Sequence, residues 1–157
     1  MNRIGFGFDT HRLEEGHDFR LGGIRIAHTK GATGHSDADA LIHAICDAML
    51  GAAGLRDIGY HFPDTSSEFK GIDSSILLQK TLILITEQSF TIGNIDSTIV
   101  LQSPKIGEFI PGMIKTLSAI LKIGEKQISI KAKTSEKLGF IGREEGDSAY
   151  AVVLLTS

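Results

Sequence analysis

The segment Gly5-Phe6-Gly7-Phe8-Asp9-Thr10-His11 constrains the fold most, because it ends an apolar N-terminal strand with two potential metal ligands at alternate positions. Alternate side chains on an extended strand share a face. A carboxylate and an imidazole together suit a zinc-like divalent ion and leave room for a third ligand and an open position. The pair alone also fits an ordinary surface or hydrogen-bonding role, so a third ligand decides between the two interpretations.

A helix is predicted from Ser36 to Gly51 or Gly54, and it supplies a third candidate ligand, His43. Ser36 or Asp37 can cap this helix at its start. His43 lies off the apolar stripe that is expected to face the core. That stripe comprises Leu41, Ile42, Ile45, Cys46 and Met49.

His43 also belongs to a polar line along the same predicted helix. Asp39, expected in the first turn, and Asp47 lie four residues to either side of it, so all three side chains share a face. A carboxylate on this line can fix the tautomer of a metal-bound histidine. The alternative is a solvated helix face that contains a histidine.

Length, charge and cysteine content narrow the class of protein. The 157 residues fit one domain, 1–157. A net charge of −3 and scattered Lys and Arg argue against nucleic-acid binding. The single cysteine, Cys46, falls in the apolar stripe and indicates a reducing compartment. No membrane-spanning run or signal segment is apparent, so we expect a cytoplasmic protein, or a plastid one if a transit peptide has been removed.

The remaining pattern predicts an α/β (α+β) fold. It is a single-domain sandwich of a mixed four-stranded sheet with helices on one face. The uncovered face is expected to pack against copies of the chain, which favours a homo-oligomer. After the first strand the expected elements are a hairpin at 19–26, a mobile stretch at 28–34, the helix above, a polar loop at 57–65, a helix from 73 or 74 to 88, a strand at 91–102, a helix at 111–122, and strands at 127–133 and 149–155.

A phosphate-handling segment follows one of these strands. Thr134-Ser135-Glu136-Lys137-Leu138-Gly139 offers hydroxyls and amides for phosphate oxygens, and a glutamate for a magnesium ion shared with them. The alternative is a turn with local hydrogen bonds. Lys105 and Arg143 add cations near strand ends. The glycine-rich nucleotide motifs are absent, so those binding modes are set aside.

Taken together and in register, these motifs resemble the 2-C-methyl-D-erythritol 2,4-cyclodiphosphate synthases of the non-mevalonate isoprenoid pathway. The resemblance covers residues 3–155. The matching motifs are Gly7-Phe8-Asp9-x-His11, His35-Ser36-Asp37-x-Asp39-x-x-x-His43, Asp57-Ile58-Gly59, Phe62-Pro63-Asp64-Thr65, Lys70-Gly71-x-Asp73-Ser74, and Lys131-Ala132-Lys133-Thr134-Ser135-Glu136-Lys137-Leu138-Gly139.

The resemblance implies a homotrimer with active sites between subunits, and Zn²⁺ held by Asp9, His11 and His43. It also implies a CMP-releasing lyase. The 2-phosphate of 4-diphosphocytidyl-2-C-methyl-D-erythritol 2-phosphate attacks the β-phosphorus of the diphosphate and closes a ring. Glu136 and the diphosphate then hold a second cation, Mg²⁺ or Mn²⁺. Positioning and charge neutralisation suffice for such chemistry, which needs no covalent enzyme intermediate.

The resemblance further implies that His35 and Ser36 hold the 2-phosphate and that His35 and Thr134 stabilise the transition state. It places an isoprenoid diphosphate in a channel along the trimer axis, near Phe8, Arg143 and Glu145. The implied substrate-binding residues are Asp9, Thr10, His11, His35, Ser36, Asp57, Ile58, Gly59, Phe62, Pro63, Asp64, Thr65, Ser66, Leu101, Gln102, Ser103, Pro104, Lys105, Ile106, Gly107, Lys133, Thr134, Ser135, Glu136, Phe140 and Arg143.

Four departures from the family pattern stand out. Thr10 replaces an aliphatic residue, with its side chain expected on the opposite strand face. Ser66 replaces an aspartate, which should weaken one polyol contact. Lys133 replaces a threonine and adds positive charge beside the diphosphate. Asp147-Ser148 replace small apolar residues, a change that the sequence does not explain.

Two other functions remain open on the sequence. A zinc-dependent phosphoester hydrolase would use the same three ligands and open position to activate water, and would release a linear product. A non-catalytic trimeric metal-binding module would tolerate the loss of His35 or Thr134. Neither explains the phosphate-handling motifs together with the metal ligands.

Overall fold

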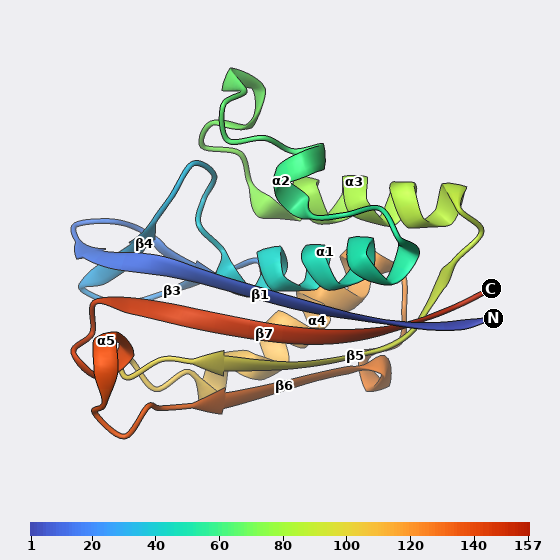
Figure 1. Ribbon diagram of the computed structural model, residues 1–157. Coiled ribbons are helices and arrows are strands. Elements are labelled where there is room, and N and C mark those ends of the chain that lie inside the picture. The colour runs from blue at the N-terminus through green and yellow to red at the C-terminus, as the bar shows by residue number, and fades with distance from the viewer.

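The computed structural model describes all 157 residues, in a mixed α/β arrangement (Figure 1). The strands are β1 (Asn2–Glu15), β2 (Phe19–Leu21), β3 (Ile24–Ile26), β4 (Lys30–Thr33), β5 (Thr91–Val100), β6 (Ile128–Lys133) and β7 (Gly146–Thr156). The helices are α1 (Ala40–Ala53), α2 (Ile58–His61), α3 (Ser74–Glu87), α4 (Ile110–Leu121) and α5 (Gly139–Gly142).

The main sheet has five strands in the order β4-β1-β7-β5-β6. Only β5 and β6 run parallel, so the sheet is mixed as predicted. The expected strand count of four was wrong, because the stretch at 28–34 contains β4, which pairs with the far end of β1 from Arg12↔Thr33 to Glu15↔Lys30. Its Gly- and Thr-rich sequence suggested mobility, but the long β1 offers it a hydrogen-bonding edge. The predicted hairpin, β2 and β3, forms a separate two-stranded sheet.

Helices cover one face of the main sheet, as expected (Figure 1). α1 packs on β1 and β7, α4 contacts β6, and α3 packs on α1 and α4. The central strands leave apolar side chains exposed on the other face. These are Ile4, Phe6, Phe8, Tyr150 and Val152.

Gly5 and Gly7 allow α1 to lie directly on the backbone of β1. A Cβ atom at Gly5 would lie 1.8 Å from the Ala48 carbonyl oxygen, and one at Gly7 would lie 1.9 Å from the Ala44 carbonyl oxygen. No side chain fits between the two elements at these positions. The close approach sets the distance between Asp9 and His11 on β1 and His43 on α1.

The start of α1 differs from the prediction. Asp39, not Ser36 or Asp37, is the N-cap, and its side chain accepts a hydrogen bond from the amide of Ile42 at 3.0 Å. The fully buried carboxylate also accepts from the amides of Gly22 at 3.0 Å and Gly23 at 2.7 Å. The cap therefore ties the β2–β3 turn to the helix. The helix ends at Gly54 in the left-handed conformation, one of the two predicted stops.

The other predicted elements are present with shifted ends. α3 begins after its cap Asp73, as predicted. The loop at 57–65 contains the short helix α2, capped by Asp57. In β6, Ile128 and Ile130 are buried, whereas Ala132, two residues further along the strand, is exposed.

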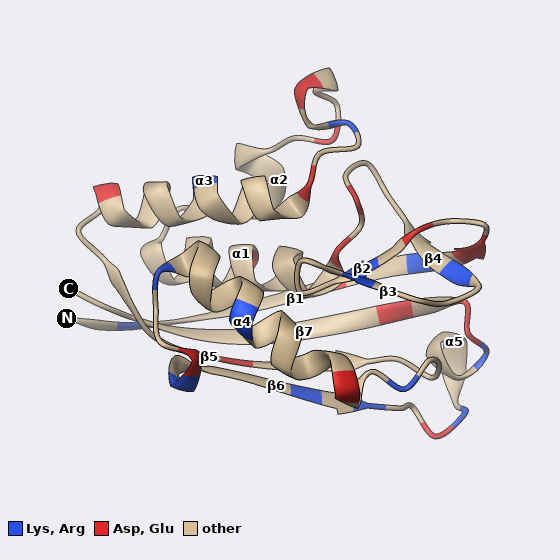
Figure 2. Ribbon diagram, turned by 180° about the vertical axis from the view of Figure 1, so that it is seen from behind, with Lys and Arg blue, Asp and Glu red and all other residues tan.

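Cys46 is fully buried among apolar side chains, as predicted from its place in the stripe. Figure 2 shows acidic and basic residues spread over helices, strand ends and loops rather than gathered on one element. None of the helices combines the length and apolar character that a membrane span requires.

Candidate metal and phosphate site

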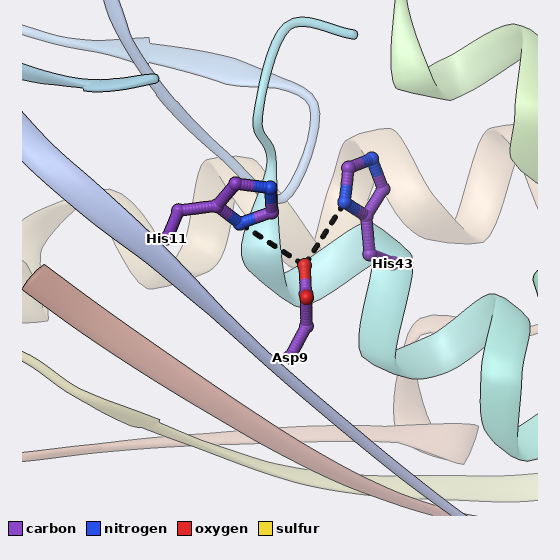
Figure 3. A group of neighbouring side chains, drawn as sticks. All are labelled: Asp9, His11 and His43. Carbon is purple, nitrogen blue, oxygen red and sulfur yellow. Dashed lines mark hydrogen bonds and ion pairs between the residues drawn. The ribbon is translucent and has the colours of Figure 1, made fainter. Parts of the chain in front are cut away.

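Asp9 and His11 of β1 meet His43 of α1 at one end of the sheet (Figure 3). A single carboxylate oxygen, Asp9 Oδ2, lies 3.0 Å from His11 Nδ1 and 2.9 Å from His43 Nδ1. All three ligand atoms lie within 4.8 Å of one another. The structure thus brings together the three ligands expected from the sequence.

The charges of this cluster are mutually stabilising. Burial opposes ionisation of Asp9, but the two histidines outweigh it and lower the pKa of this carboxyl to about 2. Burial likewise opposes a charged His11, whereas Asp9 raises the pKa of the imidazole above its usual value. Asp9 therefore stays an anion and suits a cation at the point where the three side chains meet.

The residues fit a divalent metal on their own geometry. His11 Nδ1 is buried and has no hydrogen-bond partner, although it lies near the Asp9 carboxylate. A buried ring nitrogen left without a hydrogen-bond partner beside a carboxylate is suited to metal ligation. Two imidazoles and one carboxylate, with a cavity on their open side, form the donor set of a catalytic metal site.

The predicted role of Asp39 and Asp47 as partners of the His43 ring was wrong. The Asp39 carboxylate accepts hydrogen bonds from the amides of Gly22, Gly23 and Ile42 instead. Asp47 accepts a hydrogen bond from the amide of Ile58 at 3.0 Å. His43 Nε2 instead lies 3.0 Å from Ser36 Oγ and 2.9 Å from Ser74 Oγ. Helical spacing places side chains on a face, but their partners come from other elements.

A cavity of about 350 Å³ opens over the metal ligands. His35 and Ser36 line it from the loop before α1, and Ile58, Gly59, Phe62 and Asp64 line it from the segment around α2. His35 Nε2 also lies 3.0 Å from the backbone oxygen of Ser66. The residues expected at the 2-phosphate thus lie beside the metal ligands, and many of those expected at the polyol lie opposite them.

A second cavity, of about 470 Å³, contains most residues expected at the nucleotide. Its lining residues are Leu101, Gln102, Pro104, Lys105, Ile106, Gly107, Glu108, Ala132, Lys133 and Thr134. It shares no lining residue with the cavity at the metal ligands. Within one chain, the predicted catalytic residues His35 and Thr134 therefore line separate cavities.

The segment after β6 is a tight turn beside this second cavity. The amide of Glu136 donates to Thr134 Oγ1 at 3.2 Å, and Ser135 Oγ donates to the backbone oxygen of Leu138 at 2.7 Å. The amide of Lys137 donates to Gln102 Oε1 at 3.0 Å. Glu136 is exposed and has a positive φ of 54°. The local hydrogen bonds of the turn are present, and the Glu136 carboxylate is free for a cation.

Thr10, Phe140 and Arg143 lie apart from both cavities. Thr10 points away from the metal ligands, as predicted, and its hydroxyl lies 2.8 Å from Ser148 Oγ. Phe140 and Thr10 line a third cavity of about 280 Å³, which His11 also lines, so this cavity adjoins the first one. Arg143 pairs with Glu145 through two contacts of 2.9 and 3.2 Å.

Asp147, one of the unexplained departures, is a buried carboxyl group without a hydrogen-bond partner on either oxygen. It lies opposite His11 in the β1–β7 pairing. Burial raises its pKa to about 7. Between about pH 4 and 7 the folded chain keeps a proton that the unfolded chain has released, so stability falls as pH rises.

Asp147→Asn is expected to remove this loss of stability, because the amide cannot ionise. The free energy of unfolding of the variant, compared with that of the unchanged protein, should therefore increase by roughly 2–3 kcal/mol as the pH is raised from 5 to 8. Urea unfolding of the metal-free proteins at both pH values measures the difference. If the free energies of unfolding of the two proteins changed with pH in the same way, the Asp147 carboxyl would ionise as readily in the folded chain as in the unfolded one.

The fold and the site define an α/β protein with a candidate metal centre at one of two cavities, and comparison with known proteins gives its family. The model of the YgbB family matches residues 2–156, so the chain belongs to this family. The 2-C-methyl-D-erythritol 2,4-cyclodiphosphate synthase of Bacteroides thetaiotaomicron is 60% identical over 153 residues, which cover 98% of this chain and 96% of that protein.

Solved structures agree with this relationship. One structure of 2C-methyl-D-erythritol-2,4-cyclodiphosphate synthase has 39% identity and a TM-score of 0.91, covering 98% of this chain and 100% of that chain. The Plasmodium falciparum protein, in complex with CDP, has 39% identity and a TM-score of 0.86, covering 98% and 95%. The activity of this chain is therefore that of a lyase that forms the cyclic diphosphate in isoprenoid biosynthesis, as the resemblance implied.

Proposed function

We propose that the chain cyclises 4-diphosphocytidyl-2-C-methyl-D-erythritol 2-phosphate with release of CMP, using the cavity at Asp9, His11 and His43. The observation that carries this proposal is the placement of His35 and Ser36 in the same cavity as the metal ligands. A phosphate held by these two side chains lies beside the metal. Ile58, Gly59, Phe62 and Asp64 line the same cavity and would face the methylerythritol, whereas Asp57, Pro63, Thr65 and Ser66 do not line it in the single chain.

The second cavity is proposed to take the cytidine and its diphosphate. Lys105 and Lys133 supply positive charge, and Thr134 supplies a hydroxyl for the diphosphate. A related protein whose structure contains CDP supports this assignment. Because His35 and Thr134 line different cavities in one chain, we propose that the second cavity of a neighbouring subunit completes the site.

The chemistry requires two phosphate groups to approach each other, so charge neutralisation and positioning are the main tasks. We propose Zn²⁺ at Asp9, His11 and His43, and Mg²⁺ or Mn²⁺ at Glu136, both of which supply Lewis-acid polarisation of phosphate oxygens when bound. His35 and Ser36 orient the attacking 2-phosphate. Thr134 donates a hydrogen bond to the diphosphate as its charge grows, and the cavity walls limit access of water.

Incubation of the zinc-loaded protein with the substrate and Mg²⁺, followed by ³¹P NMR, tests the reaction. Equal amounts of CMP and a cyclic diphosphate are expected. A linear phosphate product carrying solvent oxygen would establish the hydrolase instead. No turnover by a zinc-loaded oligomer would favour the metal-binding module.

The trimer is proposed from the uncovered sheet face, where Phe6 is 62% exposed between Ile4 and Phe8. Phe6→Asp would place a charge in the proposed contact, so we expect monomers and loss of CMP release. Ile83→Asp, at an exposed apolar residue of α3, is the matched control and should leave a trimer. Sedimentation velocity distinguishes these states, and a wild-type monomer that is fully active would overturn the proposal.

Two further expectations remain proposals. An isoprenoid diphosphate would lie in the trimer channel near Phe8, with the Arg143–Glu145 pair at its polar end. Native mass spectrometry that finds no such ligand in several preparations would argue against it. A cytoplasmic location is proposed from the phosphorylated nucleotide substrate and is tested by cell fractionation.

A further inference from the structure

The second ring nitrogen of His43 lies within hydrogen-bond distance of two hydroxyl groups. Ser74 Oγ lies 2.9 Å from His43 Nε2, and Ser36 Oγ lies 3.0 Å from it. Ser74 is fully buried, whereas Ser36 lines the cavity. The two hydroxyls therefore differ in what else they can contact, because only Ser36 can reach a ligand.

Ser74 is in turn fixed by Asp37. Its hydroxyl donates a short hydrogen bond to Asp37 Oδ1, and its amide donates to Asp37 Oδ2 at 2.9 Å. Asp37 Oδ1 also accepts from the amide of Asp39 at 3.2 Å. The carboxylate thus holds the Ser74 side chain in one orientation.

The direction of these hydrogen bonds follows from the groups involved. An ionised carboxylate only accepts, so the one hydroxyl proton of Ser74 is directed to Asp37. The lone pairs of Ser74 Oγ then face His43 Nε2, which must donate. With its proton kept on Nε2, the imidazole can present the Nδ1 lone pair to a metal ion, which takes the place of the proton that Nδ1 shares with Asp9 Oδ2 at 2.9 Å when no metal is bound.

We propose that Ser74 and Asp37 are positioning residues that keep His43 in the Nε2–H form and so prepare Nδ1 to bind the metal. The inference rests on the metal site of the proposed function. Ser36 is the second, exchangeable acceptor, and its hydroxyl can turn to a bound phosphate while Ser74 keeps the imidazole in place.

The helix does not need the Ser74 hydroxyl for its own start. Asp73 is the N-cap of α3, and its carboxylate accepts from the amide of Ser75 at 2.8 Å. The same region also joins the loop before α1 to the wall of the cavity. The amide of Asp37 donates to the Ile72 oxygen at 3.1 Å, and the amide of Gly71 donates to the His35 oxygen at 2.6 Å. The hydrogen bonds thus connect the metal ligand to the segment that leads from the cavity wall into α3.

Ser74→Ala tests the role directly, with Ser75→Ala as the matched control one residue along the same helix. Zinc affinity is measured by competition with a chelator, without substrate. Loss of the Ser74 hydroxyl should weaken zinc binding about 10–100-fold, and Ser75→Ala should bind as the unchanged protein does. In ¹H–¹⁵N NMR of the zinc-loaded proteins, the protected His43 Nε2–H signal should be lost in Ser74→Ala only.

Asp37→Asn provides a second variant if Ser74→Ala fails to fold. Its amide group can donate to Ser74, which frees the Ser74 proton to reach His43 Nε2 and disfavours the Nε2–H form. Zinc affinity should again fall. Unchanged affinity and an unchanged His43 signal in the folded variants would overturn the inference, whereas failure of the unchanged protein to bind zinc would overturn the metal assignment itself.

Discussion

Gly7→Ala is expected to abolish metal binding and to cost the protein about 3 kcal/mol in free energy of unfolding. The added methyl group would lie 1.9 Å from the Ala44 carbonyl oxygen and 2.7 Å from the Ala48 amide nitrogen, both backbone atoms of α1. A backbone cannot turn aside as a flexible side chain does, so α1 must move away from β1. That movement separates His43 from Asp9 and His11.

Gly51→Ala is the matched control, because it makes the same change within α1 at a position where no atom lies within 4 Å of the new methyl group. There the substitution should stabilise the helix by up to about 1 kcal/mol. Urea unfolding and zinc titration of both variants separate the two effects. If Gly7→Ala bound zinc at full affinity, the close contact between α1 and β1 would not be what sets the ligand geometry.

The three candidate metal ligands could be identified from local spacing, whereas the contact that brings them together could not. Asp9 and His11 alternate on a strand, and His43 lies off the apolar stripe of a helix, so each could be found within its own segment. Gly5 and Gly7 also alternate on that strand. A glycine within a strand can mark a bulge, a bend or a close approach of another backbone. Only the structure shows that the backbone of α1 lies against Gly5 and Gly7.

The errors have a common physical cause, since each concerns contacts between distant segments. β4 forms because residues 30–33 meet the extended end of β1, and Asp39 caps α1 while accepting from a turn sixteen and seventeen residues earlier. Ser74 was missed as a partner of His43, and Asp37 as the group that orients Ser74, for the same reason, although both lie within the quoted motifs. Short-range patterns identify the residue types, but not which of them meet.

The division of the site into two cavities shows a further limit of sequence reasoning. His35 and Thr134 follow different elements, and nothing local indicates whether their cavities join in one chain. The resemblance supplied the expectation of a site between subunits, and the separate cavities agree with it. The exposed apolar sheet face, predicted from the one-sided helical cover, provides the surface through which a neighbour could contribute the second cavity.

His11→Ala is expected to lower zinc affinity and the rate of CMP release at least 100-fold, beyond the 10–100-fold typical of residues that only support a ligand. Without the imidazole, Asp9 and His43 provide two of the three protein ligands that a catalytic zinc requires. The fold should persist, because the His11 Nδ1 atom makes no hydrogen bond in the structure and Asp9 keeps its 2.9 Å contact with His43.

His17→Ala removes an imidazole that is half exposed and lies 3.7 Å from Glu14, so it controls for the loss of a histidine elsewhere near the same strand. Zinc content by mass spectrometry of the native protein and CMP release are measured for both variants. Loss confined to His11→Ala would place the metal at the Asp9–His11–His43 cluster. Full zinc content in His11→Ala would show that another residue binds the metal. The centre would then not lie at the Asp9 oxygen between the two imidazoles.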